Sequence, residues 1–138
     1  MRRGGCEDGG VSTAPRASSE FVAWLAARHP AVEGLRREHV EFNEELLPHV
    51  LFGDVTRYAA ELARESAEQP RARKRLHALL ADLDVALAEA SDGDDEVATL
   101  VWVSFVENAQ GVPGDDEEVL RDHLRSFPHL SEALSHYE

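Results

Sequence analysis

The chain has very little cysteine, lysine and isoleucine. Cys6 is the single cysteine, which excludes an internal disulfide and a cysteine-based zinc site. There is one lysine and no isoleucine in 138 residues, and aromatic residues make up 7%. Alanine and leucine predominate instead of the β-branched and aromatic residues that strands favour. The composition therefore indicates a helical protein.

Long apolar segments are also absent. The longest largely apolar run, residues 100–106 with Ser104 within it, is far shorter than the roughly 20 residues that a membrane-spanning helix needs. Arginines stand near the amino terminus, but the apolar stretch of a secretion signal does not follow them. We therefore expect a cytoplasmic protein that does not contact a membrane.

Basic residues are outnumbered by acidic ones. Fourteen lysine and arginine residues against 27 aspartate and glutamate residues give a formal net charge of −13. Such a chain is repelled by nucleic acid phosphates and anionic lipid headgroups, and it attracts basic partners. The charge predicts a basic protein partner and no nucleic acid, although it also has a simpler interpretation as a device for solubility.

Helical periodicity begins near residue 18 and continues almost to the end. Residues 1–17 are rich in glycine without a periodic apolar face, and we expect a disordered leader there. Residues 18–138 are expected to form a single helical domain. The pattern predicts an all-α fold, an antiparallel bundle of six to seven helices. They are expected at about residues 18–29, 31–42, 48–69, 70–90, 95–109, 115–127 and 129–137.

The expected helices differ in how much of their surface is apolar. Ser18 or Ser19 is the expected cap of the first, and Phe42 belongs to the apolar positions of the second. The helix near 70–90 has the most regular leucine stripe. The segment 95–109 is apolar nearly all round, which is typical of a central helix wrapped by the others. Asp115 is expected to open the next helix.

Known catalytic and metal-binding patterns are missing. Seven histidines occur, but no glutamate is followed three residues later by a histidine, and neither a His-Glu-x-x-His pattern nor a Gly-x-Ser-x-Gly pattern is found. We expect no enzymatic activity, no metal and no cofactor. The basic segment 71–75 is either a site for an acidic ligand or a solvated helix face.

Acidic residues at two places in the sequence have no obvious structural role. Asp54 lies on an apolar stripe, where an unpaired carboxylate is costly. It either pairs with Arg57 or a histidine, or it faces a cleft. Glu107 and Asn108 end an apolar helix, and a carboxylate there is disfavoured by the helix dipole.

The same stretches carry a resemblance. Residues 44–55 and 95–108 resemble a family of uncharacterised, mostly actinobacterial proteins known as a domain of unknown function. The second stretch is also similar to segments of small proteins encoded beside bacterial toxin genes and proposed to be immunity proteins. The resemblance implies a partner-binding or toxin-neutralising role and assigns no catalytic residue.

Three hypotheses follow. The first is a non-enzymatic interaction module, an acidic immunity-type inhibitor of a basic partner, with contacts at Glu44, Glu45, His49, Asp54, Glu107 and Asn108. The second is a ligand-binding or enzymatic bundle with a pocket between the third and fifth helices, lined by His49, Asp54, Trp102 and Glu107. The third is a homodimer formed through exposed apolar residues such as Trp24.

Overall fold

The computed structural model describes residues 14–89, 95–111 and 116–137, and these contain seven α-helices and no strand. The predicted all-α bundle is confirmed. The helices are α1 (Ser18–Arg28), α2 (Pro30–Asn43), α3 (Pro48–Glu65), α4 (Pro70–Ala88), α5 (Glu96–Val101), α6 (Asp116–Leu124) and α7 (Pro128–Ser135). A π-helix, η1 (Trp102–Glu107), and a 3₁₀ turn, η2 (Asn108–Gly111), continue α5.

Proline marks the first residue of four helices. Pro30, Pro48, Pro70 and Pro128 begin α2, α3, α4 and α7. Proline suits this position because its missing N–H would have no partner in the first turn. The predicted start of the third helix at Pro48 is confirmed, and the second helix begins one residue before the expected Ala31.

The first helix is capped differently from the expectation. Ser18 is the first helical residue, and neither serine caps the helix with its side chain. Instead, the backbone N–H of Ser18 donates to Glu96 Oε1 at 3.0 Å. The sequence pattern predicted that a serine side chain would cap the start of this helix. Instead, a carboxylate from α5 accepts this N–H.

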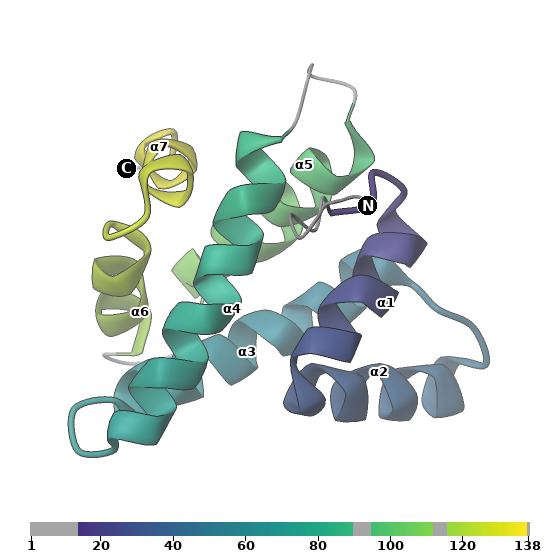
Figure 1. Ribbon diagram of the computed structural model, residues 1–138, viewed down its shortest axis with the longest axis horizontal. Helices are drawn as coiled ribbons and strands as arrows, with labels where there is room; N and C mark the ends of the chain where they lie inside the picture. Colours follow the sequence, from purple (N-terminus) through teal and green to yellow (C-terminus); the bar gives the residue numbers. More distant parts are fainter. Residues whose placement is uncertain (1–13, 90–94, 112–115, 138) are drawn as a thin grey trace, which may run out of the picture.

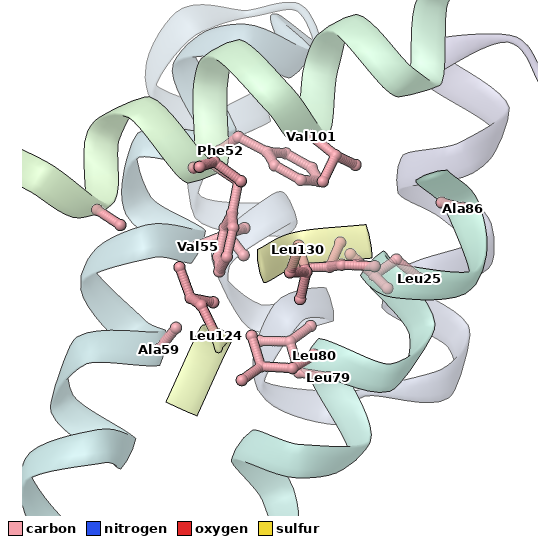
Figure 2. Packing of buried hydrophobic residues seen from close by; sticks show 14 of the residues in the cluster. Leu25, Phe52, Val55, Ala59, Leu79, Leu80, Ala86, Val101, Leu124 and Leu130 are labelled. Carbon is pink, nitrogen blue, oxygen red and sulfur yellow. The ribbon is translucent and has the colours of Figure 1, made fainter. Parts of the chain in front are cut away.

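Helix α3 occupies the centre of the fold. It contacts α1, α2, α4, α5, α6 and the π-helix. In Figure 1, α4 crosses the middle of the view, with α1 and α2 on one side and α6 and α7 on the other. The interior is formed by side chains from both sides, and Figure 2 shows several of them close together: Leu25, Val55, Leu80, Leu124 and Leu130, all fully buried.

The fifth helical segment is not the fully wrapped central helix that its composition suggested. Val97, Leu100 and Phe105 are fully buried, but Val103 is 42% exposed and Glu107 is exposed. The segment changes from α to π geometry at Trp102, with more residues in each turn. This change rotates the later side chains relative to an α-helical pattern.

The expected disordered leader ends earlier than residue 17. Ala14 is 1% exposed, and its N–H donates to Glu89 at the end of α4. Arg16 donates through Nε and Nη2 to both carboxylate oxygens of Asp95, at 2.8 and 2.6 Å. Residues 14–17 are therefore packed beside α5 (Figure 1). The leader's residues 1–13, the turn at 90–94 and the expected cap Asp115 lie outside the described residues.

Within the described ranges, no helix is long and apolar enough to cross a membrane.

Asp95 joins two elements with one carboxylate. It caps α5 by accepting from the N–H of Ala98 at 2.9 Å, and it binds Arg16. The hydrogen bond from Arg16 lowers the pKa of Asp95 below its ordinary value, since it favours the ionised form.

We expect Asp95→Ala to lower the free energy of unfolding by about 1–3 kcal/mol, because it removes a helix cap and a charge-assisted pair together. Urea denaturation at neutral pH measures the change. Glu61→Ala, an exposed acidic position on α3, is the control, with an effect within about 0.5 kcal/mol. Equal effects of the two variants would contradict the role given to Asp95.

A second carboxylate holds α4 against α1. Asp82 is 8% exposed and accepts two hydrogen bonds from Arg28, at 2.8 and 3.0 Å, and one contact from His29 Nε2 at 2.7 Å. Burial raises the pKa of Asp82, but the hydrogen bonds from His29 and Arg28 outweigh it and the net shift is downward. The ionised form is therefore stabilised by folding.

We expect Asp82→Asn to destabilise the protein by about 1–2 kcal/mol at pH 7, a modest value because Arg28 is partly exposed. A lowered folded-state pKa stabilises only above the unfolded-state value of about 4, and this contribution is lost as the pH falls through the folded-state pKa. Urea denaturation between pH 7 and pH 3 should show the two proteins converging on acidification. A constant difference would refute the assignment.

Candidate functional site

An open groove lies between the carboxyl-terminal half of α2 and the amino-terminal half of α3. Its volume is about 350 Å³. The residues that line it are Leu35, Glu38, His39, Phe42, Asn43, Val50 and Asp54. The α2 members fall at spacings of three and four residues, which places them on one face of that helix. The groove therefore has an apolar face from two helices and a carboxylate from each.

Two large apolar side chains of this groove are exposed. Phe42 is 88% exposed and Val50 is 57% exposed. The sequence pattern predicted Phe42 as one of the buried apolar positions of its helix, and that expectation is wrong. Phe42 and Leu35 lie on the same face of α2. Leu35 is half-buried, but no described segment covers the Phe42 end of that face. An exposed aromatic side chain beside a groove is unusual in a soluble protein, because contact between apolar surface and water is unfavourable.

The chain segment that forms most of the groove is acidic. Residues 38–54 include five acidic residues and no lysine or arginine. They are Glu38, Glu41, Glu44, Glu45 and Asp54. The first four are exposed, and Asp54 is partly exposed. Arg37, which directly precedes this range, binds Glu33, and Arg57 binds Asp54 from one turn further along α3. Asp54 is thus both paired and at a cleft, two arrangements that the sequence analysis treated as alternatives.

A buried histidine holds the loop at the end of the groove. His39 is 5% exposed, and its Nε2 accepts the backbone N–H of Leu47 at 3.0 Å. Asn43 Nδ2 donates to the backbone oxygen of His39 at 3.0 Å. These contacts fix the path of the chain between α2 and α3, so Glu44 and Glu45 stand at a defined place beside Phe42.

Glu44 has a left-handed backbone conformation. Its φ is 65°, and its N–H donates to the oxygen of Val40 at 2.7 Å. This position follows a helix end, where glycine is usual because a Cβ makes the conformation unfavourable. A strained glutamate next to an exposed phenylalanine favours a role for its side chain in function rather than in folding.

Behind the groove, α3 contacts the π-helix through polar groups. His49 Nδ1 lies 2.5 Å from Ser104 Oγ, and Asn108 Nδ2 donates to the backbone oxygen of Ser104 at 2.7 Å. Thr56 Oγ1 donates to Phe52 O at 2.8 Å and lies 3.4 Å from the same Ser104 oxygen. His49 and Asn108 therefore take part in the packing of η1 on α3, and their side chains are held beside the groove rather than in it.

Glu107 lies on a different side of the π-helix. Burial raises the pKa of the Tyr137 hydroxyl, and the nearby negative charge of Glu107 raises it further. Trp102 packs on His136, with ring centroids 4.9 Å apart. Both contacts are with the carboxyl-terminal residues, away from α2.

The four residues expected to share a pocket, His49, Asp54, Trp102 and Glu107, have different neighbours in the structure. Asp54 lines the groove between α2 and α3, whereas Trp102 and Glu107 contact the chain end after α7. Of the six predicted contact residues, Asp54 lines the groove, Glu44 and Glu45 lie in the loop between α2 and α3, and His49 and Asn108 contact Ser104.

Groups of histidine, cysteine and acidic side chains that could hold a metal ion are not found among the described residues.

The fold and the groove define a small all-α domain with an acidic, partly apolar surface between two helices. Residues 22–136 match the family described as a domain of unknown function, DUF7674. The chain belongs to this family, as the resemblance of its two segments indicated. Comparisons with curated proteins and with solved structures gave no match.

We expect Glu44→Gly to raise the free energy of unfolding by up to about 1 kcal/mol, since glycine adopts the left-handed conformation without strain. The added flexibility of the unfolded chain offsets part of the gain. Thermal or urea denaturation measures it, with Glu45→Gly as the matched control. A loss of stability in Glu44→Gly would show that the side chain supports the fold.

Proposed function

We propose that this protein is a non-enzymatic interaction module whose groove between α2 and α3 binds a basic protein partner. The observation that carries the proposal is Phe42, 88% exposed at a groove that is lined by the carboxylates of Glu38 and Asp54. Buried aromatic anchors supply much of the affinity of protein interfaces, and complementary charge supplies orientation and rate.

The groove favours a partner segment of definite chemistry. Its apolar face, from Leu35, Phe42 and Val50, suits an apolar side chain of the partner. Lysine or arginine residues on either side of that side chain would then lie against Glu38, Glu44 and Asp54. An amphipathic helix laid in a groove presents its residues in this way.

A second copy of the chain is a less suitable occupant. Two copies each bearing a net charge of −13 repel one another, and the repulsion is greatest where acidic grooves meet. Trp24, the residue expected at a dimer contact, is half-buried. Its ring stacks on Phe21 at 5.6 Å, and the Arg28 guanidinium lies 4.9 Å from the ring centre. Trp24 is engaged within its own chain.

We further propose that the partner is a toxin and that this protein is an immunity-type inhibitor acting in the cytoplasm. The support is the similarity of residues 95–108 to proteins encoded beside toxin genes, together with the charge of the groove. Inhibition would follow from covering a basic surface that the toxin uses to bind nucleic acid or another anionic substrate.

We expect Phe42→Ser to reduce affinity for the partner at least tenfold without loss of stability, because an exposed aromatic anchor contributes to binding and little to folding. Glu44→Gln with Glu45→Gln should mainly slow association and weaken its dependence on salt. Calorimetry and stopped-flow binding measure these effects. The test partners are basic products of neighbouring genes and a helical peptide of leucine and lysine.

Val85→Ser is the matched control, since Val85 is an exposed apolar residue on α4, outside the groove. Amide chemical shifts should change around Phe42, Val50 and Asp54 when the lysine peptide is added, and not with a glutamate counterpart. Equal loss of binding in the two serine variants would disprove the assignment of the groove. So would concentration-dependent dimerisation that Phe42→Ser abolishes.

A further inference from the structure

Four cations at the start of α4 have no carboxylate partner among the residues that the structure describes. Arg71, Arg73, Lys74 and Arg75 form no ion pair with the described residues. In contrast, Arg16, Arg28, Arg36 and Arg57 all bind carboxylates. Carboxylates outnumber cations almost two to one in this chain. A cluster that stays unpaired in such a protein creates a local positive potential, suited to an anion from outside.

One of these cations lines an open cleft. The cleft lies between the end of α3, the start of α4 and α6, and its volume is about 710 Å³. The lining residues are Ala63, Arg64, Ser66, Ala67, Arg73, Val119 and His123. Polar and cationic groups thus share the cleft with a small apolar surface from Ala63, Ala67 and Val119. The size falls within the range of small-molecule sites.

Hydrogen bonds in the cleft define where the protons lie. The Ser66 hydroxyl donates to the backbone oxygen of Ala63 at 2.7 Å, so its oxygen accepts from His123 Nε2 at 3.3 Å. His123 Nδ1 then accepts from His77 Nε2 at 3.1 Å. Burial lowers the pKa of His123, and the neighbouring His77 and Arg73 lower it further, which keeps the ring neutral at neutral pH.

This direction of donation excludes a serine nucleophile in the described state. A nucleophilic serine donates its proton to the histidine, whereas Ser66 donates to a backbone oxygen and its own oxygen accepts from His123. The N–H of His123 and the guanidinium of Arg73 are donors in the same cleft. Donors of this kind are those that bind phosphate oxygens.

We propose that the cleft formed by Ser66, Arg73 and His123 binds a phosphate-bearing small molecule. Arg73 pairs with the phosphate, His123 Nε2–H donates to it in place of Ser66 Oγ, and Ala63, Ala67 and Val119 contact the less polar part of the ligand. This site is separate from the acidic groove, and it stands whether or not the groove binds a protein. It gives the basic segment 71–75 a role as the source of positive potential.

Arg73→Gln should weaken binding of inorganic phosphate and pyrophosphate about tenfold or more, since it removes a charge-assisted pair. Chemical-shift titration of the full chain measures it, with Arg73, Ser66 and His123 as reporters. Lys74→Gln is the matched control, because it removes the same charge from the next residue, which does not line the cleft. Arg73 is exposed, so its replacement should not unfold the protein. Equal melting temperatures of the wild type and the two variants would show that the variants are folded.

The site would be supported if phosphate and pyrophosphate give saturable chemical-shift changes in the wild type and in Lys74→Gln. Only Arg73→Gln should lose this binding. Three results would overturn it. One is no saturable shift at low ionic strength. The second is an equal loss in both variants, which indicates only general charge. The third is equal or tighter binding of succinate or of a glutamate-rich peptide, since the cleft would then not select phosphate.

Discussion

Burial of α3 is the constraint on which the rest of the structure depends. Leu51, Phe52 and Val55 are fully buried within its first two turns, and Figure 2 shows Phe52 and Val55 among side chains from the surrounding helices. The same turns present Val50 and Asp54 to the groove. Because an α-helix is rigid over this distance, packing of one edge fixes the other edge. The groove is therefore positioned by the hydrophobic core rather than by a flexible loop.

Carboxylates act as connectors between helices. Glu96 accepts the N–H of Ser18 in α1, and Asp84 accepts the N–H groups of His129 and Leu130 in α7, at 2.8 and 3.0 Å. Free N–H groups at a helix start are a favourable site for an anion. Part of the acidic excess thus serves the fold. The carboxylates of residues 38–45 bind no partner helix in this way, which distinguishes the acidic groove from the rest of the surface.

The two proposed surfaces lie toward opposite ends of α3. Val50 and Asp54 belong to its start, and Ala63 and Ser66 to its end. About twelve residues of helix separate them, roughly 18 Å along the axis. This exceeds the Debye length of about 8 Å at physiological salt, so charge at one surface is largely screened from the other. The acidic groove and the basic cleft can therefore coexist and be tested independently.

The sequence by itself determined the helical class, the proline-marked starts of the helices and most of the core stripes, because these depend on local periodicity and backbone chemistry. It also singled out Glu44, Glu45 and Asp54 in one stretch of the chain, and of these Asp54 lines the groove. Tertiary structure alone decided that Phe42 is uncovered, that Arg16 binds Asp95 and that His77, His123 and Ser66 meet. A periodic pattern identifies a helix face, but whether another element covers that face, and which distant polar groups pair, depends on contacts that no local pattern encodes.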